Sequence, residues 1–371
     1  MQDYLNLNLI SENISEHRQV SKIYHPLENI IFITVSAVIS GAEHWDEIED
    51  FGNAKIEWLE KYLNLTNGIP SHDTFSRFYQ ILDPKEFQKA FLIWVNNIVE
   101  NLGGDFIAID GKTLRRSYDK KDNKAAIHMV SAWSNQNNLV LGQLKTAEKS
   151  NEITAIPELV KVVNIENSIV TIDAMGTQKS IATAIIEEKG DYILQVKGNQ
   201  PTLEKDVIAS FKNNLESDNM KSYIQPIGKK KHGRFEGRKY YITEDLSGIS
   251  QKDNWTGLKS IGMIESIRIV DGNTSITQKY FICSINDYVK TFAGASRQHW
   301  GIEVKLHWRL DVIFDEDLSR IRKGYAPENF AIIKHIALAM LMKEKSSKKG
   351  VARKRLSCAF CDDYREKVLK I

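Results

Sequence analysis

Apolar residues recur at helical spacing through the first hundred residues of the chain. A continuous apolar run follows Pro26, a residue that suits the first turn of a helix. Two more helices are predicted after Ser71 and after Asp83, because serine and aspartate cap helices and the proline that follows Asp83 fits the first helical position. Glycines from Gly103 then interrupt the pattern. We expect an all-helical N-terminal domain over residues 1–103.

After this point the pattern changes to short apolar runs, which are typical of buried strands. Asp105–Asp110, Ile127–Trp133 and Leu139–Thr146 come first, and the asparagine-rich turn between the last two predicts a hairpin. Ser168–Asp173 and Asp191–Lys197 follow, and a predicted helix precedes each of them. Such β-α-β-α-β order implies right-handed crossovers and parallel neighbours. Three antiparallel strands followed by these crossovers match the ribonuclease H-like layout, an α/β fold.

The rest of the chain mixes strands, helices and basic residues. Residues 198–290 contain further strand-like runs, and we interpret them as a β-rich insertion. A helix is predicted from about Val289 onward, and a second apolar helix over Pro327–Met342. We therefore expect a second, ribonuclease H-like domain over 104–342. Residues 343–371 carry 10 Lys and Arg against 4 Asp and Glu, which indicates a basic C-terminal tail.

Composition narrows the class of protein. With 371 residues, 42% of them hydrophobic and 26% charged, the chain can bury a large core and is neither disordered nor collagen-like. Charge is unevenly distributed. Residues 1–100 carry 7 Lys and Arg against 15 Asp and Glu, a net charge of −8, whereas the remainder carries 43 against 33, a net charge of +10. A basic larger part favours a polyanionic partner, although a solvated basic surface is the alternative.

Cysteine content and apolar runs point to the inside of the cell. Three cysteines are too few, and odd in number, for a disulfide framework. Cys358 and Cys361 form a single C-x-x-C without a second pair or a nearby histidine, so zinc is not favoured. The run Ile30–Ala42 is shorter than the roughly 20 residues that span a bilayer, and the N-terminus lacks the basic region of a signal peptide. We expect a cytoplasmic protein.

Two aspartates occupy equivalent places in the predicted sheet. Asp110 and Asp173 each end a strand and precede a glycine-containing turn. Because these strands are predicted as parallel neighbours, both side chains should meet at one edge of the sheet. Acids held close together repel each other unless a cation neutralises them, and oxygen ligands suit Mg²⁺ or Mn²⁺ rather than zinc. Two such ions about 4 Å apart can activate the attacking oxygen and stabilise the leaving oxygen of a phosphodiester. The alternative is that both aspartates are turn residues.

A third carboxylate is needed to complete such a site. On the helix predicted after Val289, His299, Glu303 and His307 fall on one stripe. We take Glu303 as the third ligand. Asp311 and Glu316 are its rivals on the same segment, and an exposed helical glutamate is the alternative.

Several blocks of sequence carry a specific resemblance. The N-terminal part reads PLENIIFITVSAVISGAEHWDEIEDFG and NGIPSHDTFSRFYQILDP. The later part reads IAIDGKTLRRS, TIDAMGTQ, YILQVKGNQ, HGRFEGR and RQHWGIEVKLHWRLDVIFDED. In order and over nearly the whole chain, these blocks resemble bacterial insertion-sequence transposases of the DDE type. More narrowly, they resemble the group that includes the H-repeat-associated proteins.

The resemblance implies a ribonuclease H-like catalytic domain with a β-strand insertion before its last acidic helix. By motif position, Asp110, Asp173 and Glu303 are the DDE triad, and the 130 residues from Asp173 to Glu303 fit the subclass with an insertion. Related transposases often place Tyr, Arg and Lys around the glutamate. Here His299 stands four residues before Glu303 and Leu310 seven after it, so those phosphate contacts do not carry over. Arg297 and Arg309 are candidate substitutes.

An activity follows from the resemblance. The enzyme would cut DNA at the ends of its mobile element and join the 3′-hydroxyls to target DNA, with Mg²⁺ as cofactor and Mn²⁺ able to substitute. Double-stranded DNA, both element ends and target, is the expected partner of a nucleoid-associated homodimer or higher oligomer. The expected DNA-binding residues are Lys112, Arg115, Arg116, Lys197, His232, Arg234, Arg238, His299, Trp300 and His307.

Alternatives remain at this level. Trp300 and Trp308 could stack on an unpaired base, but packing in the core is favoured. The acidic N-terminal helices suit assembly, or limited base contact, better than broad phosphate binding. A ribonuclease H-like nuclease that does not join strands would carry the same carboxylates, and so would a catalytically silent DNA-binding remnant of a transposon.

Overall fold

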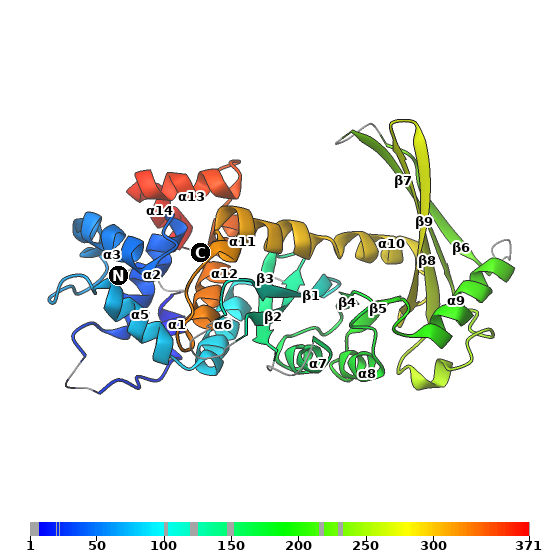
Figure 1. Ribbon diagram of the computed structural model, residues 1–371, viewed down its shortest axis with the longest axis horizontal. Helices are drawn as coiled ribbons and strands as arrows, with labels where there is room; N and C mark the ends of the chain where they lie inside the picture. The colour runs from blue at the N-terminus through cyan, green and yellow to red at the C-terminus, as the bar shows by residue number, and fades with distance from the viewer. Residues whose placement is uncertain are drawn as a thin grey trace.

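The computed structural model describes residues 7–19, 21, 23–99, 103–118, 125–146, 152–214, 219–228 and 233–370. The molecule is elongated (Figure 1). The N-terminal helices lie at one end, a sheet occupies the middle, and long antiparallel strands form the other end. Within the ranges just given, no helix combines the length and the apolar character that a membrane crossing requires.

Short helices build the N-terminal end. Ser71 caps one of them, since its hydroxyl accepts a hydrogen bond from the backbone N–H of Thr74, and Asp83 caps the next through the N–H of Lys85. Both predicted helix starts are therefore confirmed. The bounds are α1 Asn8–Glu12, α2 Leu27–Ile39, α3 Trp45–Ala54, α4 Ile56–Leu59, α5 His72–Ile81 and α6 Pro84–Ile98.

The C-terminal segment returns to these N-terminal helices. It contains α12 (Ala326–Lys343), α13 (Val351–Phe360) and α14 (Asp362–Leu369), and α13 and α14 lie beside α2 (Figure 1). The guanidinium of Arg365 is buried over the ring of Trp58, 4.0 Å from its centroid. Residues 343–371, expected only as a basic tail, thus complete the helical end. The division of the chain into domains stays a prediction.

One mixed sheet forms the centre. In the described part of the chain its nine strands follow the order β3-β2-β1-β4-β5-β9-β8-β7-β6. β1 pairs antiparallel with β2 and parallel with β4, and β4 pairs parallel with β5. The predicted hairpin and the predicted parallel neighbours are confirmed. The bounds are β1 Phe106–Leu114, β2 Ile127–Ser134, β3 Leu139–Lys145, β4 Ile169–Ile172, β5 Asp191–Val196, β6 Lys221–Gln225, β7 Arg234–Thr243, β8 Ser260–Val270 and β9 Asn273–Cys283.

The prediction that Asp110 ends its strand is wrong. β1 continues beyond it because β2 keeps pairing with β1 as far as Leu114 opposite Ile127. On the other side, pairing with β4 stops at Ile109 opposite Ile172. Asp110 therefore lies where β1 loses one neighbour and keeps the other.

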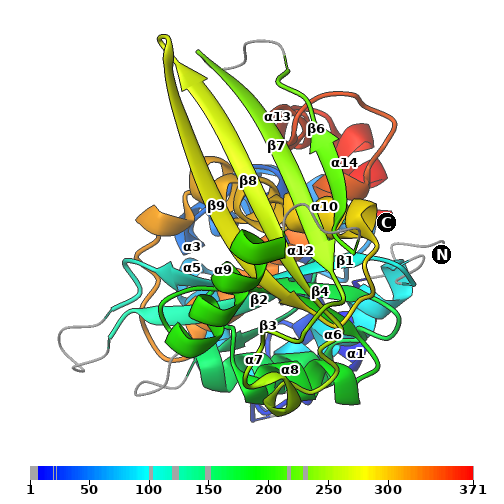
Figure 2. The same cartoon turned by 90° about the vertical axis from the view of Figure 1, so that its right-hand side faces the viewer.

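The β-rich insertion extends the same sheet. β9 pairs antiparallel with β5, with Ile193 opposite Cys283, so the long strands β7, β8 and β9 are hydrogen-bonded into the centre. Figure 2 shows these strands rising past the central sheet, with α9 (Pro201–Asn214) packed near their base. The helix α9 was not expected from the sequence. Towards Val270 and Asn273 the strands become exposed, so the hairpin of β8 and β9 projects into solvent.

Helices cover both faces of the centre (Figure 1). α7 (Glu152–Val162) and α8 (Lys179–Glu187) lie on one face. α10 (Val289–Gln298), the π-helical segment η3 (Ile302–His307) and α11 (Trp308–Ile313) cross the other face as one long, irregular helix. π-Helical turns widen a helix locally and are frequent at functional sites, and this one contains Glu303.

Candidate active site

The two aspartates occupy adjacent strands at the same level of the sheet. Ile109 on β1 pairs with Ile172 on β4, and Asp110 and Asp173 are the residues that follow them. The Oδ1 atom of Asp173 accepts hydrogen bonds from the backbone N–H groups two and three residues ahead, at 3.0 and 3.3 Å. Asp173 therefore shapes the turn after β4 with one oxygen and keeps the other for a different partner.

The helix that carries Glu303 lies against both strands. Nδ1 of His299 lies 3.1 Å from Oγ1 of Thr171 on β4, and Nδ1 of His307 lies 3.6 Å from Oδ2 of Asp110 on β1. Glu303 stands between these imidazoles in the chain, is exposed, and its negative charge acts on Asp110. The helix thus brings a third carboxylate to the end of the β1–β4 pair.

The electrostatics of Asp110 are unusual for a carboxyl group. Burial raises the pKa of Asp110 to about 7, although its Oδ1 accepts a hydrogen bond of 2.9 Å from the N–H of Gly111. The negative charges of Glu152, Asp173 and Glu303 raise this pKa further. An acid surrounded by other acids binds its proton tightly, and any cation that replaced this proton would relieve the repulsion.

Two of the histidines expected to touch DNA, His299 and His307, contact other residues of the protein. The His307 side chain is 14% exposed, and burial lowers its pKa to about 4. Burial also lowers the pKa of His299. Both imidazoles are therefore neutral at neutral pH, and their visible contacts are with Asp110 and Thr171.

The donor set matches a hard divalent cation in its chemistry. Asp110, Asp173 and Glu303 offer carboxylate oxygens only, and burial, together with the charges of its acidic neighbours, raises the pKa of Asp110. Among the described residues, no three His, Cys, Asp or Glu side chains lie close enough together to hold one metal ion as they stand. A cation would have to draw these side chains inward.

Sequence reasoning missed a further acid beside the site. Glu152, the first residue of α7, lies 2.8 Å from Nε2 of His128 on β2, and its charge acts on Asp110. A Cβ atom at Gly111 would lie 2.1 Å from Oε1 of Glu152 and 2.4 Å from Nε2 of His128. The glycine after Asp110 thus leaves room for this pair, which would have to shift if residue 111 carried a Cβ atom. Gly111 was the feature of the sequence that could have indicated this contact, but no residue near it in the sequence shows which side chains approach it.

The rival acids on the Glu303 segment are already paired. The ammonium group of Lys112 contacts both Asp311 and Glu316, and its side chain is 13% exposed. Lys112 was expected to bind phosphate, but the structure places it in this buried ion-pair network. Glu303 makes no side-chain hydrogen bond or ion pair within the described ranges, which separates it from its rivals.

Other expected DNA contacts are dispersed along the surface. Arg115 is 76% exposed, with Nε 3.2 Å from Oδ2 of Asp317. Arg116 and Lys197 are also exposed. His232 lies outside the described residues.

Arg234 and Arg238 belong to a cluster on the long strands. Nε of Arg234 lies 2.6 Å and Nη2 of Arg238 3.2 Å from the carboxylate of Glu236 on β7. Nη2 of Arg268, on β8, lies 3.3 Å from the same carboxylate. A single acid thus holds these guanidinium groups together.

A groove of about 600 Å³ runs from this arginine cluster to the helix of Glu303. Thr171 and His299 line its inner end, next to Asp173. Trp300, also in the lining, is 47% exposed, with the ammonium of Lys279 5.4 Å from the ring centroid. Trp308 is 55% exposed, so the expectation that both tryptophans pack in the core is wrong. On an outward helix face, a tryptophan finds no opposing layer to cover it.

Comparison with known proteins agrees with this arrangement. The family model described as DDE_Tnp_1-associated matches residues 11–95, and the one described as Transposase DDE domain matches residues 101–340. A structure of piggyBac transposase in a synaptic complex with hairpin DNA aligns with 99% of this chain and 82% of its own, at 13% identity and a TM-score of 0.47. That likeness is too weak to support a conclusion.

Relatives in Escherichia coli are far more similar. YncI of strain O157:H7, whose name provisionally marks it as a transposase, is 45% identical over 360 residues, which cover 96% of this chain and 92% of YncI. YhhI of strain K12, named in the same way as an H repeat-associated transposase, is 42% identical over 377 residues, covering 98% of each chain. The chain therefore belongs to the DDE transposase family, among the H-repeat-associated relatives, and is a DDE-type transposase.

Proposed function

We propose that this transposase cuts DNA at the ends of its mobile element and joins the freed 3′-hydroxyl groups to target DNA. One observation carries the proposal: Asp110, at the end of the β1–β4 pair, has a pKa raised to about 7 by burial among other acids. A cation bound beside these acids would offset their mutual repulsion, and carboxyl groups with strongly shifted pKa values gather at functional sites.

The proposal includes a ribonuclease H-like catalytic part. The strand order β3-β2-β1-β4-β5, an antiparallel hairpin followed by parallel strands, supports it. So does the position of β6 to β9, which precede the helix of Glu303 in the chain and extend the sheet.

In this proposal Asp110, Asp173 and Glu303 hold Mg²⁺, and Mn²⁺ can substitute. A divalent cation there supplies positive charge that neutralises the acids and stabilises charge on the oxygens of the phosphodiester. His299 attaches the helix to Thr171, so Glu303 is kept above the strand ends. No side chain becomes covalently attached to DNA, because positioning and charge neutralisation are sufficient.

The groove between the arginine cluster and the helix is proposed to hold the DNA backbone. Arg234 and Arg238 would bind phosphates, and the exposed ring of Trp300 would stack on an unpaired base. Assembly as a homodimer or higher oligomer on DNA, and association with the nucleoid, are part of the same proposal.

An Asp173→Asn variant tests the carboxylate assignment. The measurement is Mg²⁺-dependent nicking of a plasmid that carries both ends of the element, together with binding of an end fragment. We expect nicking to be lost and binding retained, because the carboxamide keeps the shape but not the charge. The matched control is Asp271→Asn, since Asp271 lies in the exposed β8–β9 turn with a φ of 48° that asparagine also adopts. Wild-type nicking by Asp173→Asn would refute the assignment.

Joining is tested apart from cutting. A pre-cut element end with a free 3′-hydroxyl is incubated with target plasmid and Mg²⁺, and covalent donor–target products are counted. A protein that nicks element ends and never forms these products is a nuclease, and the strand-transfer part of the proposal then fails.

A further inference from the structure

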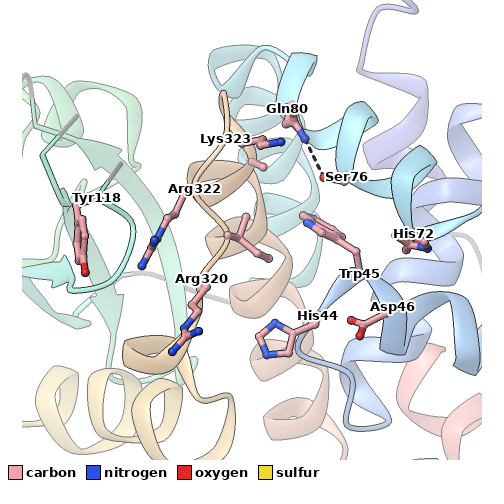
Figure 3. Close-up of a pocket in the computed structure, with 12 residues that line it drawn as sticks. His44, Trp45, Asp46, His72, Ser76, Gln80, Tyr118, Arg320, Arg322 and Lys323 are labelled. Atoms are coloured by element: carbon pink, nitrogen blue, oxygen red, sulfur yellow. Dashed lines mark hydrogen bonds between the residues drawn. The ribbon is translucent and has the colours of Figure 1, made fainter. Parts of the chain in front are cut away.

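A second large cavity lies away from the carboxylates, between the N-terminal helices and the catalytic part. It has a volume of about 870 Å³. Figure 3 shows Arg320, Arg322 and Lys323 on a single loop, with Tyr118 beyond one side and the residues of α3 and α5 on the other. None of these residues belongs to the carboxylate site or to the groove beside it.

The loop is held in place by its backbone. The N–H of Tyr325 donates to the carbonyl oxygen of Gln80, at the end of α5, over 3.1 Å. Gly324 has a φ of 54°, and a Cβ atom there would lie 2.5 Å from the same carbonyl oxygen. Glycine thus allows the loop to approach α5 closely. This contact fixes the position of the backbone that carries Arg320, Arg322 and Lys323.

The three cationic side chains of the loop differ in the contacts that they make. Nε of Arg322 donates to the carbonyl oxygen of Arg116 over 2.9 Å, and its guanidinium lies 4.6 Å from the ring centroid of Tyr118. No side-chain acceptor within the described ranges engages its terminal nitrogens. Arg320 and Lys323 are exposed, and neither side chain has an ion pair or hydrogen bond within the described ranges. An anion could therefore bind here without first displacing an internal acid.

The opposite wall belongs to the acidic helices α3 and α5, where Glu49 and Asp73 lie 2.7 and 3.8 Å from the imidazole of His72. Among the lining residues Asp46 is the acid, and His72 stands near it. The hydrogen bond from His72 to Glu49, at 2.7 Å, raises the pKa of that imidazole, so it takes up a proton more readily. Among its lining residues the cavity has three cationic side chains, Arg320, Arg322 and Lys323, against the carboxylate of Asp46, although it lies against the acidic part of the chain.

The cavity also lies along the direction of β1. Beyond Asp110 the strand runs to Leu114, and Arg115 and Arg116 follow. Arg115 forms an ion pair with Asp317, and the backbone carbonyl oxygen of Arg116 accepts a hydrogen bond from Nε of Arg322. The loop therefore follows β1 towards the cavity. At about 3.3 Å per residue, Arg116 is up to roughly 20 Å from Asp110, a little over half a turn of duplex DNA.

We propose that this cavity binds the phosphate backbone of duplex DNA away from the cutting position, through Arg320, Arg322 and Lys323. The inference rests on the proposed function, because it assumes that DNA lies across the end of β1. Backbone bound there would also contact α3 and α5, and would so connect the helical end to the catalytic part.

The test is a double variant, Arg320→Ala with Lys323→Ala, and its matched control, Lys348→Ala with Arg353→Ala. Both variants remove one exposed lysine and one exposed arginine, the control pair lying at and just before α13. Binding to a fluorescent random-sequence duplex is measured by anisotropy over a series of salt concentrations. We expect the test variant to lose at least about tenfold in affinity, and its salt slope to fall by about 2, the loss of two phosphate contacts.

Two outcomes overturn the inference: wild-type affinity and slope in the test variant, or an equal loss in the control. Thermal unfolding of each variant shows whether it folds, and if the test variant does not, a photo-cross-linking amino acid at Lys323 replaces it. Strong cross-links to the duplex support the inference, and their absence contradicts it. Nicking by the wild-type protein is scored separately. If the wild type neither binds nor nicks DNA, the proposed function fails. If the wild type nicks DNA but the cavity substitutions leave binding unchanged, only this inference fails.

Discussion

Nδ1 of His307 lies 3.6 Å from Oδ2 of Asp110, and burial lowers the pKa of that imidazole to about 4. At neutral pH His307 is therefore uncharged and does not offset the negative charge of Asp110. Lys112, two residues along β1, is already engaged by Asp311 and Glu316. Within the described ranges, no lysine or arginine side chain pairs with Asp110, so a bound cation would meet no competing positive group there.

The stability of the protein should reflect this imbalance. The pKa of Asp110 rises from 3.8 to about 7 on folding, so the folded chain binds this proton more tightly than the unfolded chain. The penalty is absent below about pH 4, grows as pH rises, and is complete above about pH 7. Asp110→Asn should raise the free energy of unfolding by roughly 2–4 kcal/mol near pH 8, at about 1.4 kcal/mol per pKa unit with an allowance for partial exposure, and by little near pH 4. Urea unfolding at both pH values measures this, and equal effects at both would contradict it.

Added Mg²⁺ should stabilise the protein without any DNA. A cation that binds the ionised acids favours the folded state, so we expect Tm near pH 8 to rise by about 3 °C or more. The shift should shrink towards pH 5, where protons compete for Asp110. Asp110→Asn should abolish it and Asp271→Asn should keep it, as followed by calorimetry. A shift that survives in Asp110→Asn would place the cation elsewhere.

Gly111→Ala should impair cutting through Glu152 and His128. Its Cβ atom would lie within 2.5 Å of both side chains, so the pair has to move away from residue 111. We expect nicking to fall between about tenfold and hundredfold while DNA binding changes little. Gly350→Ala is the control, because no atom lies within 4 Å of a Cβ there. Full nicking activity in Gly111→Ala would mean that the pair has no part in positioning Asp110.

Glu236→Gln should strengthen binding to DNA. The carboxylate of Glu236 forms ion pairs with Arg234, Arg238 and Arg268. A neutral glutamine would leave these three guanidinium groups available to bind phosphate. We expect higher affinity and a steeper salt dependence, by up to about 0.9 for each added phosphate contact. The control is Glu265→Gln, which loses one pair with Lys239 on the same strands, outside the groove. Unchanged or weaker binding would show that Glu236 does not compete with DNA.

Local signals predicted much of this structure. The caps at Ser71 and Asp83 are chemical rules of the first helical turn, and they appear where the residues indicate them. The β1–β4 pairing that places Asp110 beside Asp173 also follows from strand order, since crossovers have a fixed hand.

Other features depend on contacts between distant segments, and the sequence did not predict them. The length of β1 depends on how far β2 extends, which no feature near Asp110 indicates. The π-helical turn at Glu303 interrupts a periodicity that the sequence keeps regular. Glu152 lies near Asp110 because α7 begins there, and a glutamate that opens a helix is otherwise ordinary.

The buried position of Arg365 against Phe51 and Trp58 holds together two segments that lie far apart in the sequence. Contacts between distant segments close long loops, which costs chain entropy, so they are expected to form late in folding. We expect detachment of α14 to uncover both rings, so that a change late in the sequence would loosen helices formed by its early part.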